Sequence, residues 1–85
     1  MTVFKPGDMV TRINVGHDRI WGYVIDVDGN RVCDSNGTQR YARIHDGTYL
    51  VLSAFGARGC NFLRVFCCRT LSRLLVNESD VMRVK

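Results

Sequence analysis

The chain has 85 residues, of which 46% are hydrophobic and 24% charged, a balance that excludes intrinsic disorder and leaves room for one domain. No apolar run approaches the roughly 18 residues of a membrane-spanning helix, and the N-terminal residues lack a signal-peptide pattern, so we expect a cytoplasmic protein without membrane contact. The net charge is +4, and the whole excess lies between Gly47 and Val76, where four arginines meet no acidic residue.

The N-terminal third predicts short strands joined by turns. Pro6-Gly7-Asp8 is a turn, because proline fixes φ and glycine accepts unusual φ values. Met9–Val15 and Ile20–Asp28 alternate apolar and polar residues as half-buried strands do, with a polar loop at Gly16–Arg19 between them.

Three further turn signals follow at intervals of about ten residues, which is typical of a β-meander. They are Asp28-Gly29-Asn30, Ser35-Asn36-Gly37 and His45-Asp46-Gly47, and each supplies residues that accept the positive φ of a hairpin turn. The segments between and after them predict the return strands Arg31–Asp34, Thr38–Ile44 and Thr48–Ala54.

The segment Asn61–Val76 fits two patterns. As a helix it has an acceptable N-cap at Asn61 and an apolar stripe at helical spacing: Leu63, Phe66, Cys67, Thr70, Leu71 and Leu74. As strands it carries apolar residues on both faces, and arginine interrupts each face. We favour one added helix near residues 61–75, within an inserted basic segment at residues 55–76. Val81–Val84 then predicts a last strand that pairs with Met9–Val15 and closes a barrel.

Two short motifs resemble a known family. Lys5-Pro6-Gly7-Asp8-Met9-Val10, followed by Gly22-Tyr23-Val24-Ile25-Asp26-Val27 and Asn30-Arg31-Val32, resembles the KOW and Tudor-like branch of SH3-like β-barrels, which small bacterial and phage proteins also carry. The resemblance covers about residues 5–32. It implies one mainly β domain over residues 1–85, with five or six short antiparallel strands and loops that bind nucleic acid or protein.

Catalytic and metal-binding patterns are missing from the sequence. The four cysteines form no Cys-x-x-Cys pair, so we expect small buried thiols in a reducing compartment rather than zinc ligands. His17 and His45 each stand beside an aspartate in a polar turn, which is typical of solvated surface histidines. We therefore expect no enzyme, no cofactor and no metal site.

The acid-free segment carries the candidate ligand-binding residues. On the expected helix, Arg69 and Arg73 lie one turn apart and, with Arg58 and Arg64, form a basic ridge. Trp21 stands at a loop–strand junction, where an exposed indole stacks against a base. A solvated helix face explains the same arginines equally well, and both interpretations stay open.

Three functions are compatible with these features. The first is a non-enzymatic module that contacts nucleic acid or a nucleoprotein complex through the arginines. The second is a protein–protein module, such as a phage or mobile-element inhibitor of a host defence or nucleic-acid enzyme, since arginine is enriched at interface hot spots. The third is a self-assembling homodimer, because a small barrel has little room for four bulky apolar side chains: Phe62, Leu63, Phe66 and Leu74.

Overall fold

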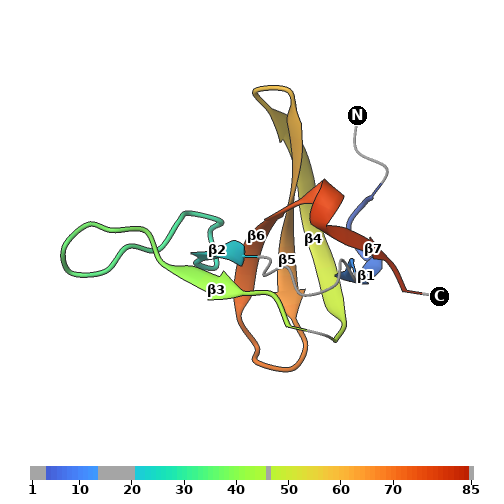
Figure 1. Ribbon diagram of the computed structural model, residues 1–85, viewed down its shortest axis with the longest axis horizontal. Coiled ribbons are helices and arrows are strands. Elements are labelled where there is room, and N and C mark those ends of the chain that lie inside the picture. Colours follow the sequence, from blue (N-terminus) through green and yellow to red (C-terminus); the bar gives the residue numbers. More distant parts are fainter. Residues whose placement is uncertain (1–3, 14–20, 46, 85) are drawn as a thin grey trace.

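A computed structural model describes residues 4–13, 21–45 and 47–84, and these residues form one antiparallel sheet of seven strands (Figure 1). The strand order is β3-β2-β6-β5-β4-β1-β7. The strands are β1 (Met9–Arg12), β2 (Trp21–Ile25), β3 (Tyr41–Arg43), β4 (Tyr49–Ala57), β5 (Cys60–Cys67), β6 (Arg73–Asn77) and β7 (Val81–Arg83), with a short 3₁₀ helix, η1 (Glu78–Asp80), before β7.

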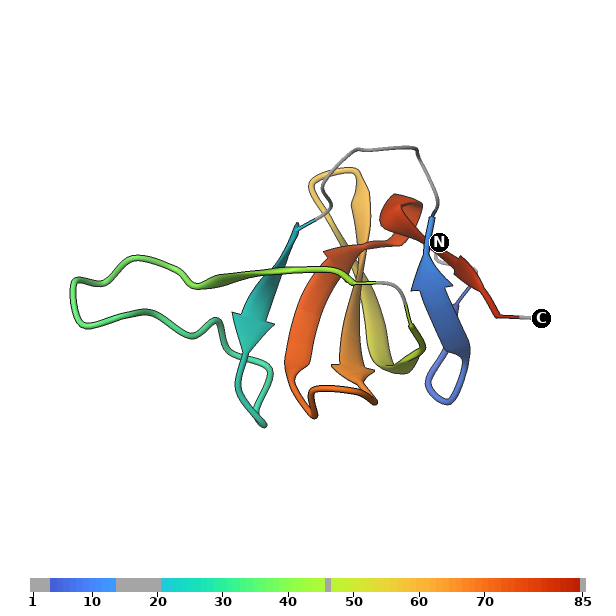
Figure 2. The ribbon, with the colours of Figure 1, turned by 60° about the horizontal axis from the view of Figure 1, so that its bottom comes forward.

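The sheet curls into a half-barrel around one apolar core (Figure 2). The core side chains come from every second residue of the central strands, as in Leu63, Val65 and Cys67 of β5. We call this the inner face of the sheet. The mainly β class is therefore confirmed, with seven strands in the described residues instead of five or six.

The C-terminal strand returns to the first strand as the sequence predicts. Val10 pairs with Arg83, Thr11 with Met82 and Arg12 with Val81. β1 also pairs with β4, through Met9–Leu50 and Val10–Tyr49. The edge strands of the described sheet are β3 and β7, which do not pair with each other, so this part of the chain is an open half-barrel.

The expected helix at residues 61–75 is wrong. This segment forms β5, a turn and β6, which are the middle strands of the sheet. Leu71, a member of the expected helical stripe, has a φ of 60° in the turn, which no right-handed helix permits. β5 instead pairs along its whole length with β4, and a β-bulge lies between Val51 and Ser53.

Two matching turns shape the segment that projects from β2 and β3. In Asp26–Asn30, the Asp26 carboxylate accepts hydrogen bonds from the backbone N–H groups of Asp28 and Asn30, both at 2.9 Å. In Asp34–Thr38, Asp34 binds the corresponding two N–H groups at 2.9 and 3.0 Å. The predicted turns at both places are confirmed.

Residues 26–40 form an arm that stands away from the sheet (Figures 1 and 2). The predicted return strand Arg31–Asp34 and the start of Thr38–Ile44 reduce to isolated bridges, Ile25–Arg31 and Cys33–Gln39, whereas Tyr41–Arg43 of the second forms β3. Carbonyl and N–H groups of Val24, Val32 and Arg40 join the base of the arm to β2 at 2.9 to 3.0 Å.

Some predicted features fall beyond these ranges. The loop at Gly16–Arg19, the adjacent strand ends and Asp46 lie outside the described residues. In the part that is described, the chain contains no helix with the length and apolar character needed to cross a membrane.

Candidate functional site

The face of the sheet opposite the core carries an unusual set of side chains, and we call it the outer face. Directly paired residues of an antiparallel sheet project on the same side. Tyr41 pairs with Tyr23, Tyr23 with Leu75, Leu75 with Arg64, and Arg64 with Ser53. One row across five strands therefore combines aromatic, apolar and cationic side chains.

The first cluster on the outer face is the tyrosine stack, formed by Tyr41, Tyr23 and Arg31. The two rings lie 4.8 Å apart, and the Arg31 guanidinium carbon lies 4.3 Å from the Tyr23 ring centre. Arg31 also donates a hydrogen bond to the Gln39 side chain at 3.3 Å, which connects the two chains of the arm. The side-chain hydrogen bond with Tyr23 raises the pKa of Tyr41, so the formal charge of this stack comes from Arg31.

The second cluster is the phenylalanine stack, formed by Phe62, Phe55 and Arg64. The rings are 5.7 Å apart with an interplanar angle of 28°, and the Arg64 guanidinium carbon is 4.4 Å from the Phe55 ring centre. Arg64 donates to the Ser53 hydroxyl at 3.1 Å. These contacts fix the guanidinium while several of its N–H groups remain available.

Further along the same face, Arg73 repeats the arrangement. Its guanidinium carbon lies 5.6 Å from the centre of the Phe66 ring. Ile25 and Leu75 lie beneath this layer and are only 5% and 6% exposed, although neither belongs to the core cluster. The arginine and aromatic side chains thus cover a small apolar area on the outer face.

The arginines of this face lack carboxylate partners. Among the described residues, Arg31, Arg58, Arg64 and Arg73 form no ion pair. Asp26 and Asp28 line a hollow with Arg64 and Arg73, yet they make no ion pair with them.

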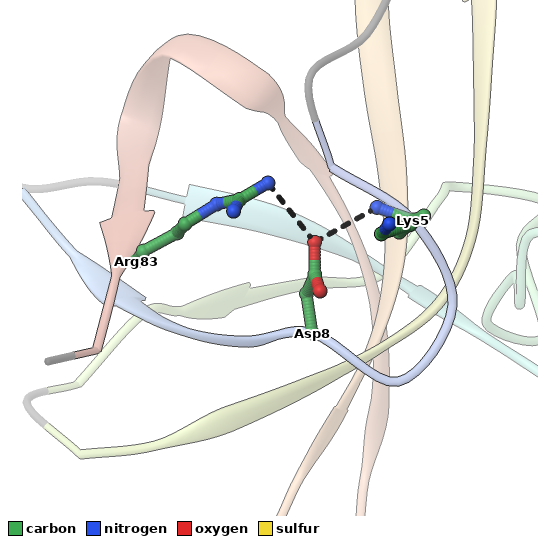
Figure 3. Close-up of polar contacts among 3 residues, drawn as sticks. All are labelled: Lys5, Asp8 and Arg83. Carbon is green, nitrogen blue, oxygen red and sulfur yellow. Dashed lines mark hydrogen bonds and ion pairs between the residues drawn. The ribbon is translucent and has the colours of Figure 1, made fainter.

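The opposite situation is found near the β7 edge of the sheet. There the Arg83 guanidinium lies 3.3 Å from the Asp8 carboxylate, which also accepts a hydrogen bond from the Lys5 backbone N–H at 3.1 Å (Figure 3). A described arginine is therefore ion-paired at this edge, whereas Arg31, Arg64 and Arg73 of the outer face form no ion pair with the described residues.

The structure places the predicted site residues in four locations. Arg64 and Arg73 lie on the outer face, and Arg58 occupies the β4–β5 turn beside the tyrosine stack. Trp21 is 52% exposed, as expected, and shares an apolar hollow with Tyr41 at the β3 edge. Arg69 is exposed in the β5–β6 turn, at the other end of β5 from Arg58. The expected helical ridge does not exist, because the segment that carries it is β-strand.

Several residues of the site were missed from the sequence. Tyr23, Arg31, Phe55 and Phe62 are not among the ligand-binding residues that the sequence predicts. A strand alternation over residues 61–67 would have placed Phe62 with Arg64 on one face. The side chains that suggested a homodimer are accommodated within the chain, since Leu63 and Leu74 are buried in the core and the two phenylalanines contact arginine or another ring.

A separate small pocket borders the core beneath the β5–β6 turn. It contains Cys67, the one buried thiol of the four cysteines, with Tyr49 and His45. Burial acts to raise the pKa of Cys67, but hydrogen bonds from Thr70, the Arg69 backbone and Tyr49 outweigh it and lower that pKa. The Tyr49 hydroxyl is bound to the backbone of His45, at 3.0 and 3.1 Å, and not to its imidazole.

Within the described ranges, no three His, Cys, Asp or Glu side chains gather closely enough to hold a metal ion. In comparisons with known proteins, no family model matches the chain, and no curated protein or solved structure shows significant similarity to it. The outer face is therefore the candidate site on chemical grounds.

Proposed function

We propose that this protein is a non-enzymatic binding module of the SH3-like type, and that its outer face binds single-stranded nucleic acid. The observation that carries the proposal is the set of arginines without carboxylate partners, Arg31, Arg58, Arg64 and Arg73, on or beside a face rich in aromatic rings. Aromatic faces stack on exposed bases, and cations neutralise the phosphates between them.

The position of the guanidinium groups supports phosphate as the ligand. A guanidinium that lies on an aromatic ring loses little hydration at its edge and keeps its planar set of N–H donors for a bidentate contact. A single strand presents bases and phosphates together, whereas a duplex keeps its base faces stacked internally. The proposal therefore favours single strands over duplexes.

Trp21 provides a direct test because it is the only tryptophan and lies on the outer side of β2, next to Tyr41. We expect oligothymidylate to quench its fluorescence and a duplex of the same length to bind more weakly. Arg64→Gln and Arg73→Gln should weaken binding, whereas Lys5→Gln, which removes one exposed charge elsewhere, should not. Anisotropy of a labelled oligonucleotide checks binding independently of Trp21, and absence of binding in both assays would refute the proposal.

The exposed aromatic pair at the β3 edge favours a second candidate. Trp21 and Tyr41 are 52% and 55% exposed beside an edge strand, and such side chains are enriched at protein-interface hot spots. A host protein captured by the chain after complete nuclease treatment, and lost with Trp21→Ala, would favour a protein–protein module. Capture that nuclease abolishes would favour the nucleic-acid function.

A further inference from the structure

A hollow lies between the base of the arm and the tip of the β4–β5 hairpin, two parts that project from the sheet (Figure 1). One wall is the tyrosine stack, represented by Tyr23 and Arg31. The other wall is the hairpin tip, and its lining residues are Ala57, Arg58, Cys60 and Phe62. Among the described residues, the lining contains two cations, two aromatic rings and no carboxylate.

Both walls are held in place by their own contacts. Arg31 is fixed by the Tyr23 ring and by Gln39, and Phe62 is stacked on Phe55. Arg58 and Gly59 form a two-residue turn with φ values of 52° and 78°, between the paired residues Ala57 and Cys60. Positive φ at both central positions defines a rigid type I′ hairpin, so the Arg58 side chain starts from a fixed point.

The chemistry of the hollow matches a flat aromatic group that carries a phosphate. A base stacks on a guanidinium plane or on a phenylalanine ring, and an arginine next to the base binds its phosphate. A purely apolar ligand would remove water from two cations without giving them a partner, which is costly. A phosphate alone would leave the aromatic wall unused.

We propose that this hollow is a subsite for a single nucleotide, with the base held between Arg31 and Phe62 and the phosphate bound by Arg58. The inference rests on the proposed function, since it assigns one nucleotide of the bound strand to a defined place. The subsite recognises a base and its phosphate together, and it therefore binds a free mononucleotide.

The test uses 5′-AMP, adenosine and inorganic phosphate as separate probes on the full chain labelled with ¹⁵N. We expect AMP to shift the backbone amide signals of residues 57–60 and the Arg31 side-chain signal. AMP should bind at least about tenfold more tightly than adenosine or phosphate, which corresponds to one charge-assisted contact. Arg58→Gly should reduce AMP affinity to that of adenosine and leave adenosine binding unchanged.

Arg58→Gly is chosen because glycine accepts the positive φ of this turn and preserves the hairpin. Arg69→Ala is the charge-matched control, since Arg69 lies at the opposite end of β5, and it should bind AMP like the wild type. If AMP causes no shift at residues 57–60 while oligothymidylate still quenches Trp21, the subsite is refuted and the proposed function survives. If neither ligand binds, both are refuted. Equal loss of AMP binding in both variants also refutes the subsite.

Discussion

Gly29 and Gly37 form a matched pair for testing how the arm supports the outer face. Each occupies the same position in one of the two matching aspartate turns, and their φ values are 87° and 81°. Alanine at either position should cost about 1–3 kcal/mol, because a side chain disfavours this conformation. The two sites differ in what a new methyl group would meet. A Cβ at Gly29 would lie 2.9 Å from Arg64 Nε, whereas a Cβ at Gly37 would have nothing within 4 Å.

The difference between the two variants therefore measures the contacts of Arg64. In Gly29→Ala the Arg64 side chain has to shift, and we expect its guanidinium to leave the Phe55 ring, at a cost of about 0.5–1 kcal/mol. It also loses the hydrogen bond to Ser53, which contributes about 0.5–1.5 kcal/mol. We expect the free energy of unfolding of Gly29→Ala to lie about 1–2.5 kcal/mol below that of Gly37→Ala, as the sum of these two terms.

Urea denaturation of both variants gives this difference, and oligothymidylate titration of the same samples gives its consequence for binding. Gly37→Ala should bind like the wild type, because its turn lies at the tip of the arm without contact to Arg64. Gly29→Ala should bind more weakly. Equal free energies of unfolding for the two variants, or unchanged binding by Gly29→Ala, would refute the role we assign to Arg64.

Three further predictions concern charge, packing and pH. Four phosphate contacts to a single strand give a slope of about −2.8 when the logarithm of the association constant is plotted against the logarithm of the salt concentration. The affinity should therefore fall about 50-fold between about 50 and 200 mM salt. A slope near zero in anisotropy titrations would contradict this. Leu63→Ala should lower the free energy of unfolding by about 2–5 kcal/mol, because Leu63 is fully buried. Leu52→Ala, 37% exposed at the bulge, should cost clearly less in the same urea titration, and equal losses would count against the assigned faces. Burial raises the pKa of Asp80, so stability should fall as pH rises from the unfolded pKa through the folded one. Asp80→Asn should reduce the pH dependence of the urea midpoint over this acidic range. An unchanged pH dependence in this variant would exclude the effect.

The sequence predicts the local turns and the pairing of the first and last strands well. Gly29 and Gly37 mark the turns Asp26–Asn30 and Asp34–Thr38, because both glycines have a positive φ that few other residues accept. The pairing of Val81–Arg83 with β1 is also predicted, and it is confirmed by the register Val10–Arg83, Thr11–Met82 and Arg12–Val81. These features depend on nearby residues or on a simple period.

The central strands could not be assigned because both of their faces are apolar. Leu63 and Val65 face the core, while Phe62 and Phe66 face outward, and this double pattern overlaps the helical spacing. The arginine that interrupts the outer side is tolerated because it lies on Phe55, a contact between strands that no sequence period encodes. The same error concealed the outer face, since a helix would have directed its arginines elsewhere.

The side chains of the outer face shield apolar residues from water and still leave cationic groups that can bind a ligand. An open half-barrel has one core, so Ile25 and Leu75 on the second face need cover from something other than a second sheet or a helix. Aromatic rings with guanidinium groups over them provide that cover while the cations remain in contact with water. If the cover were only structural, acidic neighbours would stabilise it further, as Asp8 does for Arg83. The outer-face arginines form no ion pair in the described chain, although Asp26 and Asp28 line a hollow with Arg64 and Arg73. A bound phosphate backbone would give these arginines direct anionic partners.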